Sequence, residues 1–154
     1  MRIVAYMPLF TRSTTIGRSY WTAVAAQLIH PGRVIVCFTG DGDFIMSSPE
    51  LATAVQYDLP IVVLLVNNGM YATIRMHQER QFPGRVIGTD LENPDFAALA
   101  IAYGAHGERV ERTEDFEAAF DRALASGRPS VLELPVDPEQ ISPRVRLSEL
   151  RGRA

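Results

Sequence analysis

The sequence contains no lysine, because all 15 of its basic residues are arginine. Without a lysine amine, the chain cannot form a Schiff base with a carbonyl substrate or build a phosphate-binding loop that depends on lysine. Cys37 is the only cysteine, which excludes an internal disulfide framework and a zinc site made of several cysteines. No apolar run approaches the roughly 20 residues of a membrane span, and the net charge of −3 argues against a nucleic-acid partner. We therefore expect a cytoplasmic protein that acts on a small molecule.

The composition is that of a single globular domain, with 47% hydrophobic and 21% charged residues. Three segments differ in character. Residues 1–20 contain arginine but no acidic residue and follow no clear pattern, so we expect a divergent or irregular start. Residues 21–137 alternate between apolar runs and turn residues and form the expected domain. Residues 138–154 are rich in proline and arginine and are interpreted as a C-terminal tail that is disordered or lies on a neighbouring molecule.

Two continuous apolar runs, at 34–38 and 61–66, are typical of parallel strands that are buried on both faces. Between them, Ser48 is the expected N-cap of a helix that has Pro49 at its first position. The remaining predicted elements are helices at 22–30, at 93–103 behind an Asn93-Pro94 cap and at 113–125, and a strand at 130–134. This alternation predicts an α/β fold, namely a doubly wound parallel sheet with helices on both faces.

Polar side chains follow both of the long predicted strands, with Asp41 after the first and Asn68 after the second. A strand–helix–strand crossover makes the strands parallel, so their C-terminal ends meet at one edge of the sheet, where open α/β sheets bind ligands. Carboxylate and amide oxygens suit Mg²⁺, which also takes phosphate oxygens and water. Gly40 and Gly42 flank Asp41 and let a ligand approach the backbone closely. The pattern therefore predicts a site for Mg²⁺ and a diphosphate.

GDG at 40–42 and NN at 67–68, with 24 residues between them, resemble the motif of thiamine-diphosphate enzymes. The stretches PELATAVQYDLPIVVLLV and NPDFAALAIAYGA extend this resemblance over residues 21–137, which look like the C-terminal, diphosphate-binding domain of the acetolactate synthase-like branch. The resemblance implies Mg²⁺ ligands from the side chains of Asp41 and Asn68 and from the Met70 carbonyl. It also implies that Gly40 belongs to the cofactor site and that the diphosphate accepts hydrogen bonds from the backbone of Gly42, Asp43 and Tyr71.

Three departures from the family pattern affect the site. Asp43 stands where a small polar residue or alanine is common, so its carboxylate must point away from the phosphates. Residues 14–23 align poorly with the stretch that supports the cofactor, although Ile16 falls where a bulky apolar residue lies under the thiazolium. His77 replaces the tryptophan that reads the acceptor keto acid in acetolactate synthases. Either His77 and its neighbours accept a different substrate, or Arg75, His77, Glu79 and Arg80 form a solvated helix face.

The resemblance implies a thiamine-diphosphate-dependent decarboxylase or carboligase that acts on a 2-keto acid. The family's central and pyrimidine-binding domains have no counterpart in these residues, so we expect the 154-residue chain to be inactive alone. Its expected partners are other copies of itself or a pyrimidine-binding domain, and surfaces that meet them should be apolar. The alternative is a non-catalytic fragment or binding module with the same fold and no cofactor. The substrates and the oligomeric state stay open.

Overall fold

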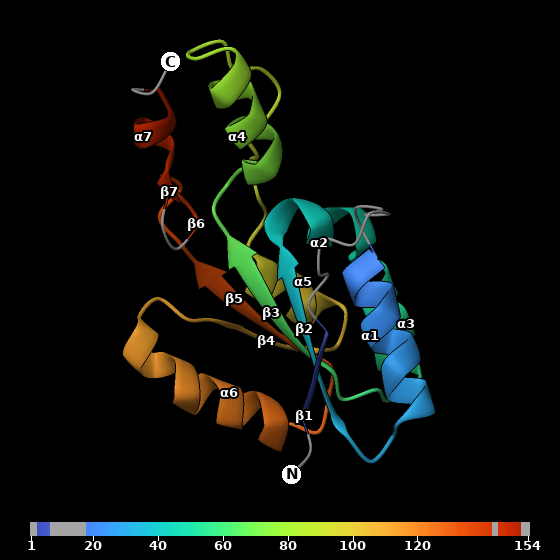
Figure 1. Ribbon diagram of the computed structural model, residues 1–154. Coiled ribbons are helices and arrows are strands. Elements are labelled where there is room, and N and C mark those ends of the chain that lie inside the picture. The colour runs from blue at the N-terminus through green and yellow to red at the C-terminus, as the bar shows by residue number, and fades with distance from the viewer. Residues whose placement is uncertain (1–2, 7–17, 143–144, 152–154) are drawn as a thin grey trace.

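The computed structural model describes residues 3–6, 18–142 and 145–151 (Figure 1). Its centre is a five-stranded sheet in the order β1-β2-β3-β5-β4, and every pair of neighbouring strands is parallel. The strands are β1 (Ile3–Tyr6), β2 (Val34–Gly40), β3 (Val62–Asn67), β4 (His106–Arg109) and β5 (Ser130–Pro135). The predicted strands at 34–38, 61–66 and 130–134 are confirmed, and the first two are direct neighbours.

Helices cover both faces of the sheet, as predicted (Figure 1). The helices α1 (Arg18–Ile29), α3 (Glu50–Gln56) and α5 (Phe96–Ala102) lie on one face, and α6 (Phe116–Ala125) lies on the other, entered through a 3₁₀ turn at Thr113–Asp115. In β3, Val63 and Leu65 belong to the first core while Val62 and Leu64 belong to the second. Because successive side chains alternate between faces, a strand between two cores is apolar throughout.

A short helix, α2 (Asp41–Ser47), follows β2 without an intervening loop. Its Phe44 is fully buried between two other rings. The ring of Tyr20 from α1 meets it edge-on at a centroid distance of 5.9 Å, and the ring of Phe96 from α5 does so at 5.7 Å. Edge-to-face pairs at these distances are favourable beyond the area they bury. The three rings therefore tie α1, α2 and α5 together beside the point where β2 ends.

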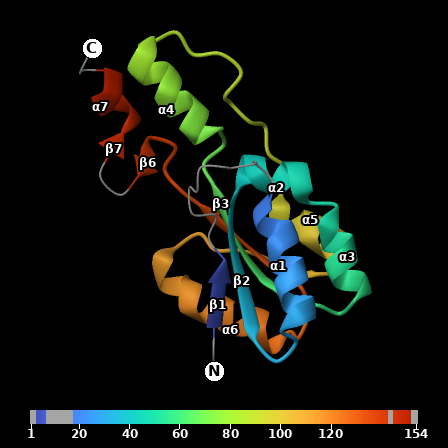
Figure 2. The same ribbon diagram turned by 45° about the vertical axis from the view of Figure 1, so that its right-hand side comes forward.

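A second group of elements lies beyond the C-terminal edge of the sheet (Figure 2). It contains α4 (Ala72–Gln81), the antiparallel pair β6 (Gln140–Ser142) and β7 (Val145–Arg146), and α7 (Leu147–Arg151). Leu147 and Leu150 are buried, and both α7 and β6 contact α4. The described part of the tail is therefore folded onto α4 of its own chain, which differs from the expectation of a disordered segment or one that lies on a neighbour.

Several element boundaries differ from the predicted ones. The helix expected from Ser48 is α3, and a helix that was not expected, α2, precedes it from Asp41 behind the extended Gly40. The helix expected after Asn93 begins later, since the carboxylate of Asp95 accepts a hydrogen bond from the Ala98 N–H at 2.8 Å and caps α5. Within the segment expected to be irregular, residues 3–6 form β1 and α1 begins before residue 20. In the described part of the chain, each helix is too short or too polar to cross a bilayer.

Candidate functional site

The carboxylate of Asp41 lies where β2 meets α2 and is 3% exposed. Its Oδ1 accepts a hydrogen bond from the Gly42 N–H at 2.9 Å. Its Oδ2 accepts one from the Gly69 N–H at 2.8 Å and another from Asn93 Nδ2 at 2.7 Å. The ends of β2 and β3 therefore meet at this carboxylate, as the sequence predicted, and the segment before α5 joins them.

The loop after β3 carries the other two predicted metal ligands. Asn68 Oδ1 accepts a hydrogen bond from the Met70 N–H at 3.2 Å, and the Met70 carbonyl accepts one from the Ala72 N–H at 2.9 Å. Gly69 adopts a φ of 69°, a left-handed conformation that favours glycine. An antiparallel bridge between Met70 and Asp90 holds this loop against the segment that leads to α5. The loop thus lies beside Asp41, and a shared cation stays a prediction.

The chemistry of these groups fits a hard divalent cation. Asp41 forms no ion pair with any basic side chain of the described residues, although its carboxylate is buried. A buried charge is costly unless it is compensated, and three N–H donors compensate it only in part. Among the described residues, no three His, Cys, Asp or Glu side chains gather around a common point. A cation beside Asp41 would therefore depend on amide and carbonyl oxygens as well, which Mg²⁺ accepts.

Two of the three predicted diphosphate donors already form hydrogen bonds within the protein. The Tyr71 N–H donates to the Thr89 carbonyl at 2.8 Å, and the Gly42 N–H donates to Asp41. Both bonds would have to exchange for these amides to donate to a diphosphate, and the two contacts stay predictions. A Cβ added at Gly42 would lie 2.7 Å from Tyr71 Cδ1, so the tyrosine ring requires glycine there.

Three predicted cofactor-site residues remain, namely Asp43, Gly40 and Ile16. Asp43 Oδ2 accepts a hydrogen bond from Thr39 Oγ1 at 3.0 Å, so its carboxylate is held against the end of β2. This contact is compatible with the expectation that the Asp43 carboxylate turns away from a diphosphate. Gly40 is the exposed N-cap of α2. Ile16 and the start of the poorly matching stretch at 14–23 lie outside the described residues.

The charged residues of α4 are not all solvated. Glu79 is fully buried, and its Oε2 accepts a hydrogen bond from the Gly84 N–H at 3.0 Å. The Arg75 side chain is 15% exposed, and its Nε lies 3.5 Å from Glu79 Oε1. Its Nη1 donates hydrogen bonds of 3.0 Å to Thr89 Oγ1 and to Asp90 Oδ1. The solvated-face interpretation is wrong for Arg75 and Glu79, which hold α4 to the segment that follows it. His77 and Arg80 are exposed, and a role of His77 in choosing the substrate stays a prediction.

Sequence reasoning gave no site role to three polar residues that continue inward from Asp41, although Asn67 belongs to the NN motif. Asn93 bonds both Asp41 and Asn67, and Asn67 Nδ2 donates to Glu133 Oε1 at 2.8 Å. One sequence signal was available for Glu133, since it is a charged residue inside an otherwise apolar buried strand. The Asn93-Pro94 pair predicts a helix cap instead. The contact of Asn93 with Asp41 spans 52 positions, so the residues next to Asn93 do not indicate it.

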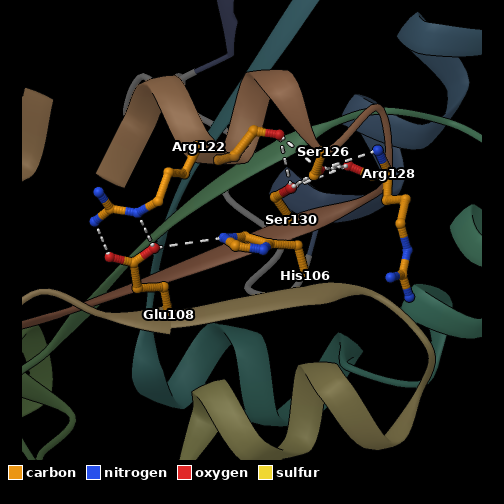
Figure 3. A network of polar contacts seen from close by, with 7 residues as sticks. His106, Glu108, Arg122, Ser126, Arg128 and Ser130 are labelled. Carbon is orange, nitrogen blue, oxygen red and sulfur yellow. Dashed lines mark hydrogen bonds and ion pairs between the residues drawn. The ribbon is translucent and has the colours of Figure 1, made fainter. Parts of the chain in front are cut away.

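A separate polar network joins β4 to α6 and the turn before β5 (Figure 3). His106 begins β4, and its Nε2 lies 3.6 Å from Glu108 Oε2. Glu108 also pairs with Arg122 of α6, whose Nε donates at 3.1 Å. The Ser130 hydroxyl lies within hydrogen-bonding distance of the carbonyls of Ala123 and Arg128, and its single hydrogen links the end of α6 to the turn before β5. These contacts join helices and strands of the fold, and their contribution to stability is enough to explain them.

The pair of Glu108 and Arg122 makes stability depend on pH. The pKa of Glu108 is held below its ordinary value of 4.5, first by the hydrogen bond from Arg122 and also by the charges of Arg122 and His106. A lowered folded-state pKa stabilises the protein above the unfolded pKa, and the stabilisation is lost as the pH falls through the folded pKa. Arg122→Gln should therefore lower the unfolding free energy at pH 7, by no more than the small amount typical of an exposed ion pair.

The difference in unfolding free energy between the wild type and Arg122→Gln should shrink steadily as the pH is lowered below 4.5. Urea unfolding of both proteins across the acid range measures it. Arg33→Gln is the control, because Arg33 is exposed and forms no ion pair with the described residues. A loss in Arg122→Gln that stays constant down to the lowest pH would show that the ion pair is not its cause.

Comparison with known proteins places this site in a family. Residues 5–134 match the family model described as thiamine pyrophosphate enzyme, C-terminal TPP binding domain. The chain is 38% identical over 124 residues to the acetolactate synthase isozyme 2 large subunit of Escherichia coli, covering 80% of the chain and 23% of that protein. It is 31% identical over 132 residues to a probable acetolactate synthase large subunit of Methanocaldococcus jannaschii, covering 85% and 22%. A putative thiamine pyrophosphate-containing protein of Bacillus subtilis is 38% identical over 140 residues, covering 90% and 24%.

The chain thus spans less than a quarter of the length of these curated relatives, and the matched part is the cofactor-binding region. The family match covers GDG, NN and every strand from β2 to β5. The predicted resemblance is therefore confirmed at the level of the family and of its acetolactate synthase-like branch. The chain belongs to the C-terminal thiamine pyrophosphate-binding domains of thiamine pyrophosphate enzymes.

Proposed function

We propose that this domain binds thiamine diphosphate through Mg²⁺ at the C-terminal edge of the sheet. Asp41, Asn68 and the Met70 carbonyl would hold the cation, and backbone groups around Gly42 would hold the diphosphate. When bound, the cofactor supplies stabilisation of a carbanion, and the protein supplies its position. The observation that carries the proposal is the buried Asp41 carboxylate, which the ends of two strands and the segment before α5 surround, with no basic side chain of the described residues paired to it.

The role proposed for the whole protein is decarboxylation or carboligation of a 2-keto acid. Asp41 and the loop after β3 would fix only the diphosphate end of the cofactor. Orientation of the reacting centre also requires its pyrimidine end to be held, which we assign to another copy of the chain or to a pyrimidine-binding domain. The exposed apolar side chains of α1 and α2, namely Trp21, Leu28, Ile45 and Met46, support a partner on that side of the domain.

Calorimetric titration with thiamine diphosphate tests the proposal directly. We expect binding in the presence of Mg²⁺ and none measurable with EDTA, because a carboxylate beside a phosphate requires a bridging cation. A folded chain that binds no cofactor with Mg²⁺ would favour the alternative, a binding module with the same fold. The 154-residue chain tested alone should bind without catalysing CO₂ release from pyruvate, and robust turnover would contradict the assignment of the pyrimidine end to a partner.

A further inference from the structure

Glu133 is an unusual residue for the middle of a buried strand. Its side chain is 0% exposed, and its Oε2 has no hydrogen-bond partner among the described residues. Arg109 Nη1 donates a long hydrogen bond of 3.4 Å to Oε1, but the Arg109 side chain is 47% exposed and also donates to Glu111 at 2.7 Å. A buried carboxylate with so little compensation costs more than an apolar residue of similar size. Stability alone therefore does not explain why a glutamate occupies this position.

The carboxylate of Glu133 determines how the Asn67 amide is turned. A carboxylate only accepts hydrogen bonds, so the Asn67 NH₂ group must face it, and the distance from Nδ2 to Oε1 is 2.8 Å. Asn67 Oδ1 then faces the opposite way. It accepts hydrogen bonds from the Gly69 N–H at 3.2 Å and from Asn93 Nδ2 at 2.8 Å.

The Asn93 amide is turned by the same rule. Its NH₂ group donates one hydrogen to Asn67 Oδ1 and the other to Asp41 Oδ2, at 2.8 and 2.7 Å. The Gly69 N–H is shared between Asn67 Oδ1 and Asp41 Oδ2. The two donors to Asp41 Oδ2, the Asn93 amide and the Gly69 N–H, therefore also donate to Asn67 Oδ1. The Asn67 amide in turn donates to Glu133.

We propose that Glu133 is a positioning residue for the Asp41 site and acts through Asn67 and Asn93. With an acceptor at each end, the two amides have one favourable orientation, and hydrogen bonds to ionised groups are stronger than those between neutral groups. These hydrogen bonds from Glu133 through Asn67 and Asn93 keep the Asp41 carboxylate and the loop after β3 in one geometry. That this geometry serves a cation rests on the proposed function, whereas the hydrogen-bonded chain itself does not.

The test compares Glu133→Gln with Glu133→Met. Both variants remove the charge and keep a similar volume, but only glutamine keeps an acceptor for Asn67 Nδ2. Amide hydrogen exchange of the apo protein is followed by NMR, with Gly69 as the reporter and Ala123 in α6 as the reference for global opening. We expect Gly69 protection to fall about tenfold or more in Glu133→Met, as for loss of a hydrogen bond to a charged group. Glu133→Gln should stay within about threefold of the wild type.

Glu133→Leu provides a second variant if Glu133→Met does not fold, since it also removes the acceptor for Asn67 Nδ2 and should lower Gly69 protection in the same way. The inference is overturned if Gly69 keeps its protection in whichever variant folds. It is also overturned if Ala123 loses protection equally, because the effect would then be global.

Titration with Mg²⁺ and thiamine diphosphate forms a separate arm. We expect affinity about tenfold weaker in Glu133→Met than in Glu133→Gln, in the range seen when groups behind metal ligands are replaced. Equal affinities would overturn a role of Glu133 at the cofactor site. If the wild type itself binds nothing, the proposed function fails, and the exchange measurement still decides whether Glu133 positions Asp41.

Discussion

Asp41→Ala is expected to abolish Mg²⁺-dependent binding of thiamine diphosphate, with a loss of affinity of about 100-fold or more. Replacing groups that only support a metal ligand already costs 10–100-fold, and Asp41 is the single carboxylate among the proposed ligands. The buried position of Asp41 adds to the effect, since water cannot readily take the place of its oxygens there. Calorimetry of the variant with cofactor and Mg²⁺ measures this loss.

Two variants separate loss of the cation from loss of the local fold. Asp41→Asn keeps the volume and one oxygen acceptor, so it should retain the fold while binding more weakly than the wild type. Asp121→Ala removes an exposed carboxylate of α6, away from the site, and should bind as the wild type does. Retained Mg²⁺-dependent binding in a folded Asp41→Ala protein would contradict the proposed metal site.

Phe44→Ala is expected to lower the free energy of unfolding by about 3–5 kcal/mol, which is the usual cost of truncating a buried phenylalanine. Phe44 is fully buried, and it is the central ring between Tyr20 and Phe96. Its loss would leave a cavity among three helices and break two edge-to-face contacts. Because domains are stable by only about 5–15 kcal/mol, the variant should unfold at a much lower urea concentration.

Phe82→Ala is the matched control, because the same side chain is removed from a residue that is 55% exposed. It should change the unfolding free energy by about 0.5 kcal/mol or less. If Phe44→Ala cost no more than Phe82→Ala, the three rings would not form a stabilising core. Both measurements use urea denaturation, where an unchanged slope shows that the midpoints report stability.

The strands were predictable because the sheet is buried on both faces. Such strands have continuous apolar runs, and the runs at 34–38 and 61–66 stood out from their surroundings for that reason. The convergence of Asp41 with the loop after β3 was also predictable, since it follows from the parallel crossover alone. Both conclusions needed only the local pattern and a general rule of topology.

Local chemistry explains why the start of α2 was missed. Gly42 has a low helix propensity, and the sequence of glycine, aspartate and glycine is typical of a turn. The structure nevertheless begins the helix at Asp41, with acidic residues in its first turn, where the helix dipole favours them. A glycine is needed at position 42 because the Tyr71 ring packs there, and no local pattern announces that contact.

The interior of the site could not be predicted because its contacts join distant parts of the chain. The sequence predicts Asn93 as a helix cap, but Asp95 is the residue that caps α5. Asn93 instead donates a hydrogen bond to Asp41. Glu133 was counted only as part of a strand, and its bond to Asn67 spans 66 positions. Which side chains meet across such separations is decided by the packing of the whole domain.

The same separations have a consequence for the order of events during folding. The hydrogen bonds around Asp41 join residues that lie 26, 28, 52 and 66 positions apart. Closing loops of this length costs chain entropy before any contact repays it, so the site is completed only when β2, β3, β5 and the segment before α5 have all docked. Nascent chains that end before Glu133 would lack the last link, and any ligand of this site would bind the finished domain and stabilise it by mass action.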